Sequence, residues 1–414
     1  MTEARAAGGA AERAARESYG KLLAYLAARG GDINAAEDAL ADAFAAALEH
    51  WPADGVPRTP EAWLLVTARR RLFDGARREQ RTQRLHEHLT RAANDAQRAF
   101  DRPGEIADER LASMFACAHP AIPAAIRGPL ILQVVLGLDA ARIASAFLIS
   151  PATMGQRLVR AKRKIAAAGI PLRVPPVEEL PGRLDAVLSA IYAIFSEGWD
   201  DPAGVDPRAR GFASEALWLG RLVADACTEE PEAIGLLALM LHAHARRRAR
   251  RDPSGAYVPL DEQEPTLWDA GAIDEAESLL LRAARAKRPG RFQLEAAIQS
   301  AHAARRFRGT PDWRAIAALY DELLRLTGSP VVALNRAVAI GNAAGAQAGL
   351  VALAAAAEDR RLLDYQPYWA ALAELRARNG EPDEARAAYA NAIGLCIDPS
   401  ARRYLAGRAD RLKT

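Results

Sequence analysis

Apolar residues recur at intervals of three and four along most of the chain, which is the spacing of one face of an α-helix. In the segment 33–51, INAAEDALADAFAAALEHW, the apolar side chains fall on one side of a helix and the acids on another. The apolar set is Ile33, Leu40, Phe44 and Leu48. Beyond about residue 180, the sequence has no runs in which β-branched residues recur at every second position, as they would in a strand. The pattern therefore predicts an all-α fold.

The predicted helices group into parts that are separated by polar or proline-rich stretches. We expect a helical domain over residues 10–85, a polar linker over 86–108 and a second small helical domain over 109–172. The proline-bearing segment 169–181 then acts as a short connector. A third and larger helical domain is expected over residues 180–414.

Residues 137–165 predict two short helices around a tight turn. Asp139 is suited to cap the first helix, and Ser150 followed by Pro151 is typical of the start of the second. The second helix then has an inward apolar stripe, which consists of Met154, Leu158, Ala161 and Ile165. Its outward polar set is Thr153, Gln156, Arg157 and Arg160.

Polar and basic side chains on the exposed side of a second helix suit base edges in the major groove and the flanking phosphates. The segment 137–165 therefore predicts a helix-turn-helix with a basic reading helix. The alternative is an ordinary helical hairpin whose basic face is simply solvated.

The net charge of +3 is unevenly distributed along the chain. Residues 1–172 carry 24 Lys and Arg against 19 Asp and Glu, whereas the remainder carries 31 against 33. Residues 69–84 contain seven arginines and only two acids. Two basic helices in the first part favour binding to phosphates, although one basic helix face is often only solvated. The arginine run at 246–251 we interpret as a solvated loop, with docking against DNA or a polymerase as the alternative.

The C-terminal part has the signature of a helical repeat, clearest in residues 368–399. With Gly380 at a turn, Trp369, Leu372 and Ala373 lie on a first helix, and Ala385, Tyr389 and Ala392 lie on a second. This is the spacing of a tetratricopeptide (TPR) unit, in which small residues let two helices approach closely. A non-repeating helical bundle is the alternative.

The chain lacks the motifs of common enzymes: a Gly-rich phosphate loop, a G-x-S-x-G elbow and a His-Glu-x-x-His pair. The three cysteines, Cys117, Cys227 and Cys396, have no metal-ligand spacing, and His242 and His244 point to different faces of a helix. We expect no catalysis, no cofactor and no metal site. The N-terminus has no signal-peptide core, and polar residues interrupt the apolar segment 331–357, so a cytoplasmic protein without membrane contact is expected.

Taken together, these segments resemble an extracytoplasmic-function (ECF) sigma factor of the sigma-70 family, in the subgroup with a C-terminal TPR-like extension. NAAEDALADAFAAAL is similar to the family's acidic helix in region 2, which docks on the β′ clamp helices of core RNA polymerase. The resemblance implies that Asp38 and Asp42 contact core polymerase. The β subunit of the polymerase is expected to be a further contact partner. Three further segments are similar to sequences of this particular subgroup: residues 108–122, 190–200 and 215–222.

The resemblance also implies which residues bind promoter DNA. AWLLVTARRRLFDGARRE is similar to the helix that melts and reads the minus-10 element, which gives Arg69, Arg71, Arg77 and Arg78 the role of strand contacts. The segment 137–165 is similar to region 4, the reader of the minus-35 element, with Thr153, Gln156, Arg157 and Arg160 facing DNA. The extension is expected to regulate the factor through an intramolecular contact with the sigma domains. The alternative is a stand-alone helix-turn-helix regulator whose repeat domain binds a peptide or a small molecule.

Overall fold

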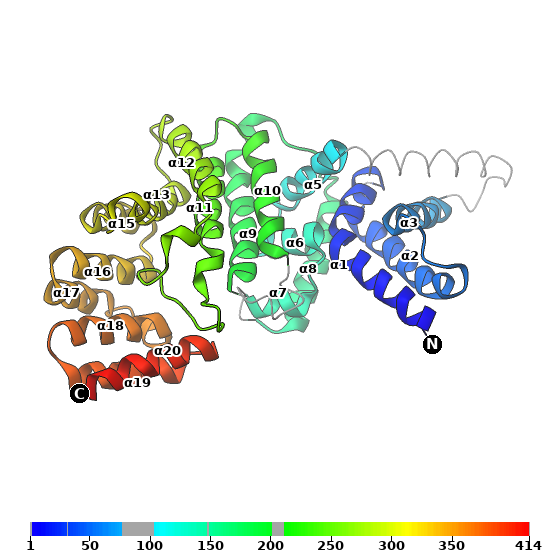
Figure 1. Cartoon of the computed structure of the whole chain (residues 1–414). Helices are drawn as coiled ribbons and strands as arrows, with labels where there is room; N and C mark the ends of the chain where they lie inside the picture. The colour runs from blue at the N-terminus through cyan, green and yellow to red at the C-terminus, as the bar shows by residue number, and fades with distance from the viewer. Residues whose placement is uncertain (1, 31, 77–102, 147–148, 201–210, 414) are drawn as a thin grey trace. The chain divides into compact units, whose positions relative to one another are not determined.

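The computed structural model describes residues 2–30, 32–76, 103–146, 149–200 and 211–413 (Figure 1). Across these ranges the chain is helical and forms no strand, and its one isolated antiparallel bridge joins Arg251 to Tyr257. The prediction of an all-α fold is confirmed. The chain divides into two compact units, residues 1–194 and 195–414.

The described part of the first unit consists of helices. Its described elements are α1 (Thr2–Gly30), α2 (Ile33–Asp54), α3 (Pro60–Ala76), α5 (Pro103–Cys117), α6 (Ala124–Leu136), α7 (Ala140–Ala146), α8 (Pro151–Ala167), η1 (Val177–Glu179) and the first part of α9 (Pro181–Asp200). The helix α5 begins inside the segment expected to be a linker, of which 86–102 lies outside the described residues. The helix α9 continues past the boundary between the units.

Helix α1 is the centre of the first unit, because it packs against α2, α3, α5 and α6. Its residues 22–27 are all buried. At Gly20 an added Cβ would lie 1.8 Å from the carbonyl oxygen of Val135, so only glycine allows the backbones of α1 and α6 to approach this closely. The helices of residues 1–76 therefore share one core with those of 103–136.

Helix α2 buries a stripe that differs slightly from the predicted one. Leu40 and Trp51 are fully buried, as are the alanines between them on the same face. Phe44 is half-buried and stacks on Tyr19, with ring centroids 6.3 Å apart. Leu48, which the pattern placed with the core, is 55% exposed. The expectation for Leu48 is wrong because it follows Ala47, the centre of the buried stripe, by about 100° around the helix.

The second unit is a succession of helices that stack one after another from α13 to α20 (Figure 1). Its elements are α10 (Phe212–Ala226), α11 (Pro231–Ala245), η2 (Arg247–Arg250), η3 (Pro265–Leu267), α12 (Ala270–Ala284), α13 (Arg291–Ala303), α14 (Arg305–Arg308), α15 (Trp313–Thr327), α16 (Pro330–Ala344), α17 (Ala346–Ala356), η4 (Arg360–Asp364), α18 (Gln366–Arg378), α19 (Pro382–Leu395), α20 (Pro399–Asp410) and η5 (Arg411–Lys413).

The pair α18 and α19 has the packing that the repeat spacing predicts. Gly380 occupies the turn with φ of 81°, and Ala373, Ala385 and Ala392 are fully buried between the helices. Tyr389 is buried in the same cluster, against which Trp369 and Leu372 pack as partly buried residues. The small residues thus allow the close approach, and the aromatic residues fill the remaining space.

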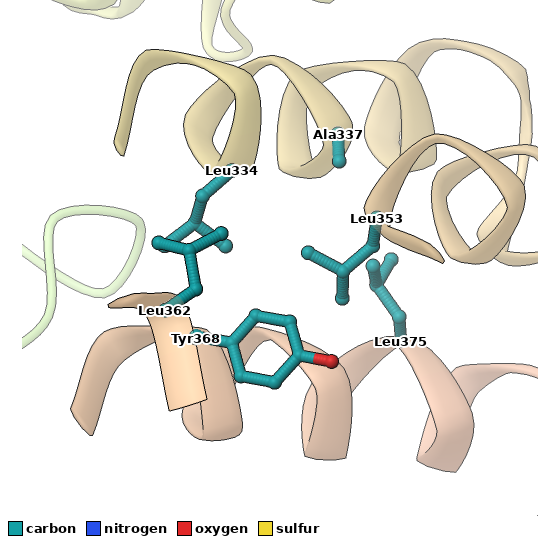
Figure 2. Close-up of a cluster of buried hydrophobic side chains, with 6 residues drawn as sticks. All are labelled: Leu334, Ala337, Leu353, Leu362, Tyr368 and Leu375. Carbon is teal, nitrogen blue, oxygen red and sulfur yellow. The ribbon is translucent and has the colours of Figure 1, made fainter. Parts of the chain in front are cut away.

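The preceding pair, α16 and α17, packs through glycine. A Cβ on Gly349 would lie 2.7 Å from the Cα of Gly341, so the two helices touch backbone to backbone. Between this pair and α18 lies a buried cluster that includes Leu353 and Tyr368 (Figure 2). The apolar segment 331–357 therefore forms two packed helices. Within the described ranges, no helix has both the length and the apolar character needed to cross a membrane.

Candidate nucleic-acid interface

The helices α7 and α8 begin at the residues that the sequence predicts. The Asp139 carboxylate accepts a hydrogen bond from the backbone N–H of Arg142 at 2.8 Å, which caps α7. The Ser150 hydroxyl accepts from the backbone N–H of Thr153 at 3.2 Å, and Pro151 occupies the first turn of α8. Both caps are formed by neighbours in sequence. Residues 147–148, between the two helices, lie outside the described residues.

Helix α8 has one buried and one exposed face. The predicted inward stripe, Met154, Leu158, Ala161 and Ile165, is buried, with none of the four more than 4% exposed. On the outward side Gln156, Arg157 and Arg160 are exposed. Thr153 is half-buried, and its hydroxyl accepts a hydrogen bond from the Ser150 hydroxyl at 2.8 Å. Exposed Arg163 and Lys164 extend the basic surface, and α8 contains no acid.

One cation of α8 does not belong to that surface. The side chain of Lys162 is only 5% exposed, and its Nζ forms an ion pair with Glu37 Oε2 on α2. Its neighbour Cys117 is fully buried, and burial raises the pKa of the Cys117 thiol. Lys162 therefore fixes α8 to α2 within the first unit. Because Glu37 lies 125 residues earlier in the chain, spacing within α8 gives no sign of this role.

The exposed face of α2 carries the predicted acids. Asp38 and Asp42 are both exposed, one helical turn apart. Glu49, also exposed, lies on the same side, since the three carboxylates fall within about 40° of the helix circumference. Exposed Leu48 lies between the buried stripe and this acidic stripe, about 80° around the helix from Asp38. Glu49 and Leu48 are not among the residues predicted to contact polymerase, although the seven-residue spacing from Asp42 places Glu49 on the same side of the helix.

Helix α3 carries the second group of candidate DNA contacts. Leu64, Leu65 and Ala68 are buried in the core of the unit. Arg71 is exposed, and Arg69 is half-buried with an interaction inside the protein. Exposed Arg70 lies between them. The other two candidates, Arg77 and Arg78, lie outside the described residues.

The arginine run after α11 does not form the solvated loop that the sequence predicts. Arg246 is half-buried and donates to the Gln299 side chain, and the side chain of Arg251 is 19% exposed and pairs with Asp398 at 2.7 Å. Arg248 alone among these three is exposed. The prediction is wrong for Arg246 and Arg251, because their guanidinium groups hold segments of the second unit together.

The described residues contain no group of three or more His, Cys, Asp or Glu side chains placed to hold a metal ion. His242 is 1% exposed, and burial lowers its pKa to about 4, with Arg246 adding to the effect. Burial also raises the pKa of Cys227 to about 11. His242 is thus a neutral core residue, and Cys227 is a protonated one.

Comparison with known proteins adds an independent line of evidence. Residues 15–82 match the family model of sigma-70 region 2, and residues 183–284 match a family of unknown function, DUF6596. The chain is 38% identical over 405 residues to an uncharacterized protein of Rhizobium meliloti (strain 1021), covering 96% of this chain and 93% of that protein. No solved structure matches the chain.

The region 2 match begins within α1 and takes in α2 and α3, which carry the exposed acids and the arginines described above. A role in transcription initiation, with core RNA polymerase and promoter DNA as partners, follows from this region. The chain belongs to the same family as the Rhizobium meliloti protein and, through its region 2, to the sigma-70 family of sigma factors.

Proposed function

We propose that the protein is an ECF-type sigma factor that directs promoter-specific initiation and carries a fused C-terminal regulatory domain. The observation that carries this proposal is the exposed acidic stripe on α2, inside the matched region 2. Asp38 and Asp42 can face a basic surface together, and Glu49 extends the same stripe. Their proposed partner is the pair of β′ clamp helices of core polymerase. Exposed Leu48 supplies apolar contact beside the charges.

DNA contacts are proposed for two helices. Arg69 and Arg71 of α3, with Arg77 and Arg78 after it, contact the minus-10 element. Helix α8 enters the major groove at the minus-35 element, with Thr153, Gln156, Arg157 and Arg160 toward the DNA. Two observations support the proposal for α8. Its exposed surface is basic and free of acids, and α8 follows a short capped helix, as the second helix of a helix-turn-helix does.

The regulatory role is proposed for the second unit because it forms a compact body of its own. Its helices pack in close pairs, such as α16 with α17. Helical repeats built from such pairs commonly present an extended binding surface. We propose that this unit controls the sigma domains through an intramolecular contact, in place of a separate anti-sigma protein.

The polymerase assignment is tested by charge reversal on α2. The double variant Asp38→Arg, Asp42→Arg of the full chain should lose at least about tenfold in affinity for purified core polymerase, because repulsion replaces attraction at both positions. Both side chains are exposed, so the fold should be kept, and circular dichroism checks this. Binding is measured by pull-down or by fluorescence anisotropy of the labelled protein.

The matched control is Asp54→Arg, which reverses another exposed acid of α2 well away from the stripe. This variant should bind core polymerase as the parent chain does. If the double variant binds core polymerase as tightly as the control, the docking role of α2 is wrong. Sequence-specific DNA binding without any affinity for core polymerase would instead favour the stand-alone helix-turn-helix regulator.

A further inference from the structure

The second unit contains a cavity of about 740 Å³. It is lined by the segment 246–268, which joins α11 to α12 (Figure 1), and by parts of the helices from α13 to α18. Half-buried apolar residues of these elements form much of its wall, among them Leu260, Trp313, Val338 and Ala371. The volume falls within the usual range of sites for small molecules, and apolar walls are typical of such sites.

Arg305 of α14 is the first of two cations in the lining. Its Nη1 donates to the carbonyl oxygen of Leu260 at 2.7 Å, and its Nη2 donates to the carbonyl oxygen of Gln263. Its guanidinium also lies 5.2 Å from the centre of the Trp268 ring. The Nε has no hydrogen-bond partner among the described residues and is not one of their buried unpaired atoms, so it remains accessible. Arg305 is thus held in place by uncharged groups and keeps an accessible donor.

Arg378 of α18 is the second cation, and it is exposed. Its Nη1 donates to Asn342 Oδ1 and its Nη2 to the carbonyl oxygen of Gly341, both at 2.9 Å. These oxygens are uncharged too, and neither arginine forms an ion pair with a carboxylate among the described residues. A guanidinium has five N–H donors, so three remain on each arginine for a further acceptor.

Three acids also contribute to the lining, and none of them pairs with these arginines. Glu374 forms an ion pair with Arg408. Glu264 accepts from the backbone N–H of Thr266 at 3.4 Å and from its hydroxyl at 3.2 Å. Glu264 and Asp261 are both exposed, so water screens their charge. The acids are therefore paired or screened, whereas the two arginines have no acid partner.

His302 indicates the sign of the electrostatic field at the cavity. This residue belongs to the lining, and its ring meets that of Trp313 edge to face, with centroids 5.3 Å apart. Burial lowers the pKa of His302 to about 4, and the positive charges of Arg246 and Arg305 add to the effect. Arg246 also donates to an uncharged oxygen, Oε1 of Gln299. The field at His302 is therefore positive and favours an anion.

We propose that this cavity binds a small molecule that carries a carboxylate or phosphate group on an apolar body. The anionic group binds to the free N–H donors of Arg305, because a guanidinium fits the oxygens of both groups. Arg378 adds a second positive charge, and the apolar body packs against Trp313 and Val338. The cavity lies within the second unit, so this inference holds whether or not the first unit acts as a sigma factor.

The probes are phenylacetate, isovalerate and phenyl phosphate, added to the full-length chain at neutral pH. Phenylacetamide and isovaleramide match the two carboxylates in shape but lack the charge. Saturation-transfer NMR and the melting temperature follow binding. We expect saturable binding of at least one anion, with a carboxylate at least about tenfold tighter than its amide, since hydrogen bonds to charged groups are the stronger ones. Comparison of phenylacetate with phenyl phosphate identifies which anionic group the cavity prefers.

Three results would overturn the proposal. If a carboxylate and its amide bind equally well, the arginines contribute nothing to binding. If inorganic phosphate binds as tightly as phenyl phosphate, the apolar walls contribute nothing. If none of the three anions binds saturably, the cavity holds water alone.

Variants then locate the bound anion. Arg305→Gln removes the cation that we place against the ligand and should weaken binding at least about tenfold. Arg378→Gln should weaken it about threefold through the loss of attraction, and it provides a second test if Arg305→Gln does not fold. The matched control is Arg308→Gln, which removes an exposed arginine of α14 that does not line the cavity and should bind as the parent chain does. Unchanged binding in a folded cavity variant, or an equal loss in the control, would contradict the assignment.

Discussion

At the scale of single residues, Arg160 and Lys162 show how one basic helix divides its charges. Arg160 is exposed, and its Nε donates to the carbonyl oxygen of Gln156 at 3.3 Å on the same helix. Lys162 is buried and paired with Glu37. A count of cations along α8 therefore overstates what a nucleic acid can reach. The exposed set is the one to test on DNA.

We predict that Arg157→Ala and Arg160→Ala each weaken recognition of the minus-35 element. The expected loss is about 1–3 kcal/mol if the arginine contacts a base edge, and a contact to phosphate would instead reduce the salt dependence of binding. Transcription by reconstituted polymerase is measured on promoters with intact and altered minus-35 elements.

The control for these two variants is Arg285→Ala, which removes an exposed arginine of the second unit and should leave promoter recognition unchanged. If the parent chain already transcribes equally from promoters with intact and altered minus-35 elements, α8 does not read sequence.

At the scale of elements, helices α11 and α13 each contain a histidine whose imidazole stays neutral. Burial lowers the pKa of His242 on α11 and of His302 on α13 to about 4 in each case. Arg246 adds to both effects, and it donates to Gln299 of α13. In the unfolded chain these imidazoles titrate near their usual value of 6.5. Between pH 4 and pH 6.5, protonation of these imidazoles therefore favours the unfolded chain.

We predict that the second unit loses stability as the pH falls from about 6.5 to about 4. The contribution of neutral histidine is fully present above pH 6.5, because there neither state binds the proton. The loss is at most about 3 kcal/mol for each histidine, since one pKa unit corresponds to about 1.4 kcal/mol. Urea unfolding of the full chain at pH 7.5 and pH 5 measures it.

Replacing His242 or His302 by Gln should flatten this pH dependence, whatever the change in stability at neutral pH. His50→Gln is the matched control, because the His50 side chain is 61% exposed, and it should leave the dependence as in the parent chain. An identical pH dependence in all of these variants would show that the buried histidines are not its source.

At the scale of the whole molecule, α9 determines where the chain can be divided. Although the proline-rich connector precedes α9, the first unit extends to residue 194. Arg183 of α9 is 6% exposed and donates to the carbonyl oxygen of Phe115 on α5 at 3.4 Å. Leu184 and Val187 are buried as well. The first unit therefore includes a segment that a cut at the connector would remove.

We predict that a fragment of residues 1–200 melts cooperatively and that a fragment of residues 1–174 melts at a temperature lower by more than about 5 °C. The reason is the loss of several buried apolar side chains of α9, each worth about 1.5–3 kcal/mol. Circular dichroism against temperature measures both fragments. Equal melting temperatures would show that α9 contributes nothing to the first unit. If the fragments do differ, the regulatory role of the second unit is best tested in transcription with the 1–200 fragment.

The sequence by itself determined the helices, their caps and the pairing of α18 with α19. Asp139, Ser150 and Gly380 act on backbone groups a few residues away, and the stripes of α8 and α19 follow from helical periodicity. The exposure of Asp38, Asp42, Arg157 and Arg160 could be predicted in the same way. These features are local, so the order of residues is sufficient to give them.

Only the tertiary structure decided which neighbour covers each face. It exposed Leu48, buried Lys162 against Glu37, and attached Arg251 and Tyr257 to α20 through partners more than 140 residues apart. Helical periodicity specifies the direction of a side chain from its own axis, but the group that it meets depends on how distant segments pack in space.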